Sequence, residues 1–292
     1  MKINKFNKGI FYSGSGSFFW GFLGTYYFQY ITLVGAFEVV VHRCIWTSLI
    51  LLLTTSIFKK WNIFKKVVLN KKKFITLFIT SILIFGNWSV WIYAVSVNKI
   101  IDASIGYFIF PIISVFFGYI FFREKLNKKR ILSLTIVFFA SIYLFFDIKT
   151  FPWVGFVVAC LWSTYNLLRK KINVDADVGL FIESLFILPI AFVILYFIFQ
   201  NNLNDFNYSN PTLMFLLFLA GPMTVIPLFL YIKGVELSGL GPSGMIFFIT
   251  PTGQFLLGFF YYNEPFSTQK FVSFILIWIA VIIYLKDLYE NN

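Results

Sequence analysis

The stretch EVVVHRCIWTSLILLLTTSIF, residues 38–58, decides the fold class of this chain. It is a long apolar run with three ionisable side chains, Glu38, His42 and Arg43, near its start. A charged group at the centre of a membrane helix costs about 2.5–3.5 kcal/mol on insertion scales, so such groups persist where they face protein or a wet cavity. On a helix, Glu38 and His42 share one face, while Arg43 points about 140° away from Glu38. We therefore expect a membrane helix whose polar residues line a solute pathway or only hold an outer gate.

The composition indicates a polytopic membrane protein. Of the 292 residues, 59% are hydrophobic and 12% are charged, whereas soluble domains are about 45–50% apolar and about 25% charged. A spanning helix needs about 20 apolar residues. On that criterion the sequence predicts an all-α fold of ten transmembrane helices, over 9–29, 35–57, 74–97, 103–122, 131–147, 151–168, 179–199, 212–232, 243–262 and 271–287.

Basic residues are distributed unequally between the two sides of this predicted topology. With the N-terminus inside, 20 of the 24 Lys and Arg residues fall in inner segments and three in outer loops. Such an excess marks the cytoplasmic side, so both termini are expected there. The net charge of +12 follows from this topology, and no nucleic-acid partner is expected. Residues 59–73 are either an amphipathic segment on the anionic inner leaflet or a topology determinant alone.

The ionisable residues form no metal-binding or catalytic set. The chain has one histidine, and its two cysteines, Cys44 and Cys160, lie in separate predicted spans without metal-ligand spacing. No metal and no cofactor is therefore expected. A membrane-embedded lipid-modifying enzyme would need paired metal-binding carboxylates or a nucleophile–base pair, and no Asp-rich pair or second histidine stands in a span. We expect a protein that is not an enzyme.

The chain also contains an internal repeat. Pro111, Gly118 and Glu124 have the same mutual spacing as three residues that lie 140 positions later, namely Pro251, Gly258 and Glu264. The sequence thus predicts two five-helix halves, 1–149 and 150–292. Because five is odd, the second half enters the membrane from the opposite side. Inverted repeats of this kind are typical of secondary transporters, whose site lies between the halves near the midplane.

The third predicted span contains the polar-aromatic run GNWSVWIY, residues 86–93. Asn87 and Trp91 share a helix face, and Trp88 is adjacent to Asn87. A buried asparagine needs hydrogen-bond partners, which either a solute or a neighbouring helix can supply. Asn87, Trp88 and Trp91 are therefore candidates for lining a solute site, with interhelical bonding as the alternative for Asn87.

Two prolines predict helix kinks, Pro111 in the fourth span and its counterpart Pro251 in the ninth. Pro111 cannot donate a hydrogen bond to the carbonyl of Tyr107, and in lipid that carbonyl needs another partner. The kink should face protein or a cavity, which makes Ser104 and Tyr107 candidate site residues. A purely structural kink remains the alternative.

One further carboxylate, Glu183, lies in the apolar seventh span, at a position related to Glu38 by an offset of 145 residues. No basic residue stands beside it in the sequence, so we expect it to be protonated at neutral pH. As an ionisable group within the membrane, it is a candidate for the pathway or for ion coupling.

Together these motifs resemble the EamA branch of the drug/metabolite transporter superfamily, and within it the RarD-type permeases. The resemblance covers nearly the whole chain and rests on EVVVHRCIW (38–46), GNW (86–88), DASIGYFIFP (102–111), LLRKKINVDADVGLFIES (167–184), IPLF (226–229) and FILIWIAVII (274–283). It implies a permease of the bacterial inner membrane for a small organic solute, such as an amino acid, another metabolite or a drug-like compound. Phe110 stands where the family often has asparagine, which would make the cavity narrower or more apolar.

The sequence thus predicts a secondary-active transporter that works by alternating access and is driven by protons or another gradient. Arg43 is expected to bind a solute carboxylate, and either Glu38→Gln or Arg43→Ala is expected to abolish transport. A membrane solute sensor or scaffold without flux is the rival from another class. Solute binding without counterflow in liposomes would favour that rival. The substrate, the direction, the coupling ion and the oligomeric state are left open by the sequence.

Overall fold

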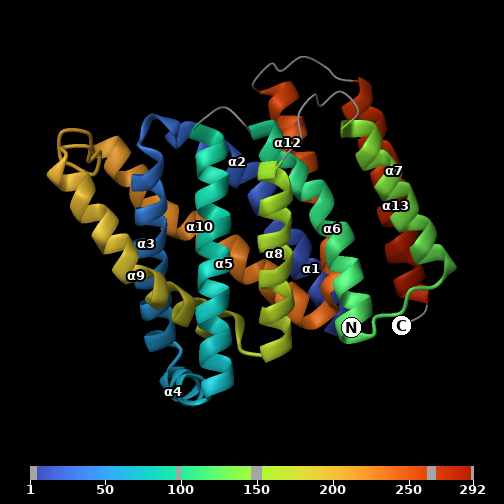
Figure 1. The fold of residues 1–292 in the computed structure, drawn as a ribbon, viewed down its shortest axis with the longest axis horizontal. Helices are drawn as coiled ribbons and strands as arrows, with labels where there is room; N and C mark the ends of the chain where they lie inside the picture. Colours follow the sequence, from blue (N-terminus) through green and yellow to red (C-terminus); the bar gives the residue numbers. More distant parts are fainter. Residues whose placement is uncertain (1–4, 97–99, 146–152, 262–267, 291–292) are drawn as a thin grey trace.

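The computed structural model describes residues 5–96, 100–145, 153–261 and 268–290, with the side chains of 95–96, 100–105 and 145 excepted. Helices account for nearly all of these residues, and no strand occurs among them (Figure 1). The α-helices are α1 (Lys5–Phe18), α2 (Thr25–Tyr30), α3 (Ala36–Ile57), α4 (Trp61–Leu69), α5 (Lys71–Ser96), α6 (Ile100–Phe122), α7 (Lys128–Phe145), α8 (Trp153–Ile172), α9 (Ala176–Gln200), α10 (Pro211–Ser238), α11 (Leu240–Ile246), α12 (Ile249–Phe260) and α13 (Thr268–Glu290).

Within the described part of the chain, six segments are long and apolar enough to cross a membrane. They are Ala36–Ile57, Lys71–Ala94, Ala176–Gln200, Pro211–Ser238, Leu240–Phe260 and Thr268–Glu290. A shorter apolar helix covers Gly106–Phe122. The prediction of an all-α, multi-pass membrane protein is therefore confirmed, whereas the full count of ten spans and their 5+5 arrangement stay predictions.

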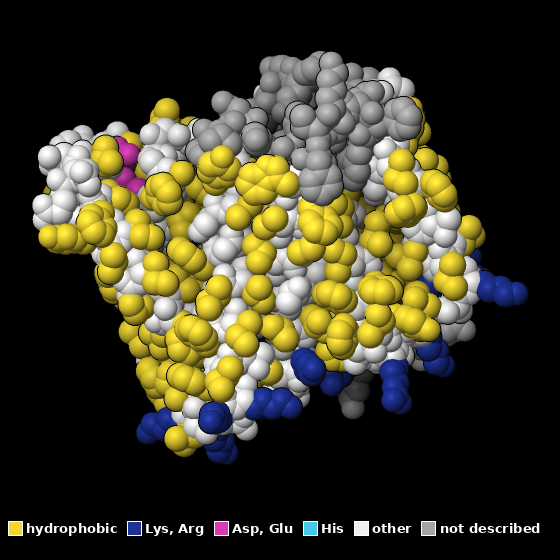
Figure 2. Space-filling view, in the orientation of Figure 1, with side chains coloured by type: hydrophobic (Ala, Val, Ile, Leu, Met, Phe, Trp, Pro, Cys, Tyr) yellow, Lys and Arg dark blue, Asp and Glu magenta, His cyan; other side chains and the backbone are white. Residues whose placement is uncertain are grey.

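Basic side chains gather at one end of the helix bundle. Figure 2 shows Lys and Arg along its lower edge, below a band of hydrophobic side chains. The start of α1, the end of α13 and α4 lie at the same end (Figure 1). The segments 59–73, 123–130 and 169–171 carry most of these charges. We call this the lysine-rich end, and it provides the reference for the position of the site.

Neighbours in space come mostly from different halves of the sequence. Helix α1 packs along α10, α5 packs along α8, and α3 packs between α9 and α10. Two glycines allow close approach in this centre. A Cβ atom on Gly16 would lie 2.8 Å from the carbonyl oxygen of Pro227 in α10, and one on Gly21 would lie 2.8 Å from that of Thr250 in α12. Small residues on the N-terminal segment thus bring its backbone against the second half of the chain.

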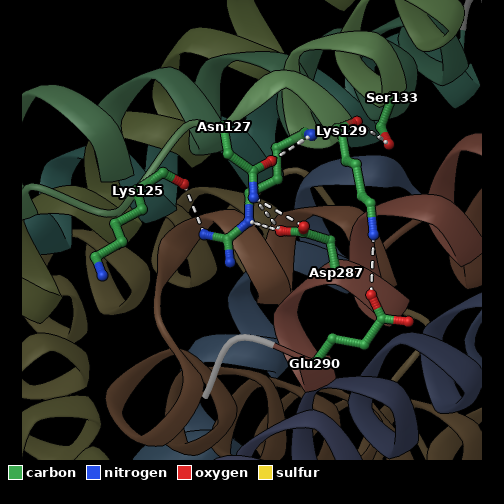
Figure 3. A network of polar contacts seen from close by, with 7 residues as sticks. Lys125, Asn127, Lys129, Ser133, Asp287 and Glu290 are labelled. Atoms are coloured by element: carbon green, nitrogen blue, oxygen red, sulfur yellow. Dashed lines mark hydrogen bonds and ion pairs between the residues drawn. The ribbon is translucent and has the colours of Figure 1, made fainter.

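Helices α7 and α13 pack mainly against each other at one side of the bundle (Figure 1). Their ends at the lysine-rich end are joined by a polar network, in which Asn127 and Lys129 of the first half meet Asp287 and Glu290 (Figure 3). Arg130 Nε lies 2.7 Å from Asp287 Oδ2, and both side chains are buried. This pair therefore fixes the periphery of the bundle, away from the centre where α1, α5, α8 and α10 meet.

Candidate functional site

A small cavity with a volume of about 60 Å³ lies among the central helices. Its aromatic lining consists of Trp20, Phe28, Trp88, Trp91, Tyr107, Trp162 and Phe247. Its polar lining consists of Thr25, Arg43, Asn87, Thr250 and Gln254. Such a pocket, mostly apolar with a few polar groups, is typical of a site for a small organic ligand.

The cavity lies in the half of the bundle away from the lysine-rich end. Helices α3, α6 and α8 all end at the lysine-rich end, and Arg43, Tyr107 and Trp162 stand within the first ten residues of these helices. Trp91 stands in the last turns of α5, which runs in the opposite direction. Residues of both sequence halves therefore form a site between the middle of the bundle and the end opposite the lysine-rich end.

Among the described residues that line the cavity, Arg43 is the one with a charged side chain, and it is only 4% exposed. Its Nε donates a 3.0 Å hydrogen bond to Thr224 Oγ1, and its Cζ lies 4.7 Å from the ring of Phe28 and 4.6 Å from that of Trp88. Among the described residues, no carboxylate lies within 4 Å of its guanidinium.

The contacts of Arg43 offset part of the cost of burying its charge but supply no negative charge. Burying an ion costs several kcal/mol even after relaxation. A cation–π contact contributes about 0.5–2 kcal/mol, and a hydrogen bond that involves a charged group contributes about 1.5–3 kcal/mol. The contacts of Arg43 with two rings and one hydroxyl therefore leave the guanidinium short of a counter-charge, beside a cavity that a ligand can enter.

The N-terminal segment reaches the cavity through a π-helical turn, Phe19–Gly24, between α1 and α2. The Thr25 hydroxyl donates to the carbonyl of Trp20 over 3.1 Å. Trp20, Gly24 and Thr25 all line the cavity. Because π-helical turns are rare and occur often at functional sites, this segment fits the role of a site wall.

Aromatic rings close the cavity toward the lysine-rich end. Trp162 lies 5.4 Å from Trp20 and 5.6 Å from Tyr231 between ring centroids, and Phe247 lies 4.8 Å from Phe110. Phe110 is 1% exposed and does not line the cavity itself. It makes the floor of the cavity apolar from behind Phe247, where an asparagine would have introduced a polar group.

The helix of the ninth predicted span is broken where the floor is formed. Phe247 and Phe248 separate α11 from α12, and Pro251 stands in the first turn of α12. Proline has no N–H to donate to the Phe247 carbonyl four residues back, and that carbonyl instead accepts from Thr250 N over 2.8 Å. By contrast, α6 continues through Pro111.

The predicted residues of the third and fourth spans gather at the cavity. Trp88, Trp91 and Tyr107 line it, as does Asn87. The Asn87 amide also donates a 3.0 Å hydrogen bond to the Val158 carbonyl of α8, so the interhelical bond considered above is present. The side chain of Ser104 lies outside the described residues.

Glu38 and His42 do not line the cavity. The Glu38 carboxylate accepts hydrogen bonds from the backbone N–H groups of Asp205 and Phe206, at 2.9 and 3.0 Å, in the loop between α9 and α10. The His42 ring stacks on Phe206 at 4.7 Å, its Nδ1 accepts from Trp46 Nε1, and its Nε2 lies 3.7 Å from Glu38. The structure thus separates these two residues, which hold a loop, from Arg43, which faces the site.

The loop between α9 and α10 also contains a titratable residue, Asp205. Burial raises the pKa of the Asp205 carboxyl, and the nearby Glu38 carboxylate raises it further. The two carboxyl groups therefore repel one another while the Asp205 backbone is bound by Glu38.

Glu183 has a basic partner, contrary to the expectation of an isolated carboxylate. Arg169 Nε of α8 lies 3.6 Å from Glu183 Oε1, and Glu183 also accepts from Thr80 Oγ1 at 2.6 Å and Tyr165 OH at 3.1 Å. The sequence did not reveal this partner because Arg169 belongs to the preceding helix, 14 positions earlier. Both side chains are buried, and neither lines the cavity.

A second carboxylate joins the two halves at the lysine-rich end. Glu124 accepts from Lys170 Nζ and from the backbone N–H groups of Leu240 and Gly241, all at 2.9 Å. It therefore caps the start of α11. The repeat marked Glu124 as notable in the sequence, but nothing local to it identified its partners.

Comparisons with known proteins agree on one family. The EamA-like transporter family matches this chain twice, over residues 7–146 and 152–286. The chain is 34% identical to an uncharacterized transporter of Vibrio cholerae, over 96% of this chain and 92% of that protein. It is 30% identical to the protein RarD of Escherichia coli, over 98% of this chain and 97% of RarD. A crystal structure with 12% identity superposes with a TM-score of 0.70, over 94% of this chain and 96% of that one, which shows a shared fold.

Proposed function

The chain belongs to the EamA-like transporter family, as a RarD-type member, and on that premise we propose that this membrane transporter is a secondary-active permease. It would move a small organic solute across the bacterial inner membrane by alternating access. The observation that carries the proposal is the aromatic cavity between the two halves of the chain, with the buried Arg43 in its wall.

The helix contacts support two inverted five-helix repeats, 1–149 and 150–292. Under an exchange of the halves, the packing of α1 on α10 becomes that of α8 on α5, and both contacts are present. The same exchange leaves three other contacts unchanged, because each joins equivalent helices of the two halves: α3 with α9, α6 with α11, and α7 with α13. The two separate matches to the family, over 7–146 and 152–286, agree with this division. In transporters built from inverted repeats, the solute site lies at the interface of the repeats, where rocking of one repeat against the other gives alternating access.

The position of the cavity supports an outward-facing conformation. A strong excess of Lys and Arg marks the cytoplasmic side, so the lysine-rich end and both termini would lie in the cytoplasm. The cavity lies in the opposite half, while the Arg169–Glu183 and Lys170–Glu124 pairs join helices at the lysine-rich end. These two pairs would therefore form the inner gate.

Unpartnered polar groups along α8 support a pathway that continues below the cavity floor. Trp162 Nε1, Asn166 Oδ1 and Arg169 Nη1 are buried, and none has a hydrogen-bond partner among the described residues. Their spacing puts them on one face of the helix. The Tyr231 hydroxyl of α10, whose ring packs against Trp162, is also without a partner. Since each such group is costly to bury, they fit a path that becomes wet when the inner gate opens.

Glu183 is our candidate for coupling transport to a proton gradient. It is a buried carboxylate at the inner gate, and its ion pair with Arg169 would be broken by protonation. Protonation from the cytoplasmic side would then favour opening of that gate.

The lysines of residues 59–73 would contact the anionic inner leaflet. The apolar side of α4 contributes less to this than the sequence indicated, because Phe64 packs on Phe181 at 5.4 Å and Val67 is buried against protein. Attraction to the lipid surface would therefore come from the exposed lysines rather than from an embedded apolar face.

The test begins with a thermal-shift screen of the purified protein with amino acids, nucleosides, amphipathic metabolites and chloramphenicol, followed by counterflow of each binding compound in proteoliposomes. Ligand binding to the native state raises the melting temperature. Exchange of a bound compound supports the permease. Binding without exchange would replace it by a sensor, and a new product formed from membrane lipids would replace it by an enzyme.

A further inference from the structure

The described residues of the cavity lining carry a positive charge and no negative charge. Arg43 is a cation, and none of the described residues that line the cavity is an Asp, Glu or Lys. The remaining polar groups, on Asn87, Thr250 and Gln254 among others, are neutral. A ligand with a negative group finds a partner here, whereas a ligand ammonium finds no carboxylate to replace the water that it loses.

The surroundings of Arg43 favour a planar acidic group. Phe28 and Trp88 lie against the guanidinium at 4.7 and 4.6 Å, and Thr224 accepts from its Nε. These contacts fix the orientation of the guanidinium before a ligand arrives. A fixed guanidinium presents parallel N–H donors that match the two oxygens of a carboxylate.

The rest of the lining favours a flat apolar body. Trp20, Trp91, Tyr107 and Trp162 present ring faces and edges to the same cavity. Aromatic pairs add attraction to the effect of area burial when their rings stack or meet edge to face. The small cavity, about 60 Å³, favours a compact solute rather than a bulky one.

We propose that the solute is a small organic anion of net charge −1, in which a carboxylate pairs with Arg43 and an aromatic or similarly flat group lies against the tryptophans. This inference rests on the proposed function for its meaning as transport. It goes beyond that proposal because it excludes zwitterions and cations as preferred ligands of the site.

Four compounds that share a phenyl group and a short chain test the charge preference. They are 3-phenylpropanoate (−1), 3-phenylpropanamide (neutral), phenylalanine (zwitterion) and 2-phenylethylamine (+1), each titrated into the purified full-length protein near neutral pH at constant ionic strength. We expect 3-phenylpropanoate to bind most tightly. In Arg43→Gln its affinity should fall by about tenfold to a hundredfold, which is the range of a charge-assisted hydrogen-bonded pair, and should approach that of the amide.

Lys66→Gln is the matched control, because it removes the same charge from an exposed position on α4. It should leave all four affinities unchanged. Equal or tighter binding of the amide, the zwitterion or the amine would overturn the proposal. So would an unchanged affinity for 3-phenylpropanoate in Arg43→Gln, or no binding of the four compounds at millimolar concentration.

Counterflow separates this inference from the proposed function. An anion that binds through Arg43 but does not exchange in proteoliposomes would leave the anion site standing and refute the permease. If a neutral or cationic compound exchanges, and exchanges equally well in Arg43→Gln, the permease would stand and the anion site would be refuted.

Discussion

Replacing Glu183 with glutamine is expected to open the lysine-rich end of the bundle. The carboxylate lies 3.6 Å from Arg169, and the two side chains are 2% exposed each. Glutamine keeps the size and a hydrogen-bonding oxygen for Thr80 but removes the charge that neutralises Arg169. Removing one partner of a buried ion pair costs about 3–5 kcal/mol, because the other charge stays buried without compensation.

That cost falls on the closed conformation, since an opened inner gate would allow water to reach Arg169. A penalty of this size shifts a two-state equilibrium on the order of 10²–10⁴-fold. Asn166 on α8 reports the shift, because it is 1% exposed and lies between Arg169 and the cavity floor. We expect maleimide to label Asn166→Cys much faster in the Glu183→Gln background, with Cys44 and Cys160 replaced by alanine.

Asp287→Asn provides the control for general loosening. It removes the carboxylate from another buried pair at the same end, Arg130–Asp287, which joins the peripheral helices α7 and α13. It should lower the melting temperature without faster labelling of Asn166→Cys. Equal labelling in both variants, or no acceleration in Glu183→Gln, would refute the assignment of Arg169–Glu183 to the inner gate.

Three further predictions concern the other carboxylates. Glu124→Ala should lower stability by about 1–3 kcal/mol, because Leu240 N and Gly241 N lose their acceptor; thermal unfolding checks this, and an unchanged melting temperature would contradict it. Glu38→Gln should release the α9–α10 loop, seen as faster hydrogen exchange at Asp205 and Phe206; equal protection would contradict it. Burial and Glu38 raise the pKa of Asp205, so its stabilising contribution is present at low pH and is lost as the pH rises through the raised pKa. The melting temperature of Asp205→Asn should therefore exceed that of the wild type increasingly as the pH rises, and a constant difference from pH 4 to 7 would contradict the argument.

Local sequence patterns were sufficient for the membrane class and for several wall residues of the site. The lengths of the apolar runs and the distribution of lysines between them predicted a multi-pass helical protein, because a membrane helix is formed by residues that are contiguous in the sequence. Asn87, Trp88 and Trp91 were identified because a polar group in an apolar helix needs an explanation wherever the helix packs. Tyr107 followed from the proline four positions after it.

Pairings between side chains of different elements were not accessible from the sequence. Arg169 meets Glu183 across the short segment that joins α8 to α9, and Glu38 binds the backbone of a loop 167 positions away. Neither contact leaves a periodic signal. The closeness of Glu38, His42 and Arg43 in the sequence was misleading as to their grouping, since a helix presents successive residues to different neighbours.

The most direct test of the central claim is counterflow of labelled 3-phenylpropanoate into preloaded proteoliposomes that contain the wild type, Arg43→Gln or Lys66→Gln. A permease that works through this cavity should exchange the anion in the wild type and in Lys66→Gln, and should lose exchange in Arg43→Gln while its melting temperature without ligand stays near that of the wild type. Exchange at the same rate in Arg43→Gln, or binding by the wild type with no exchange at all, would contradict it.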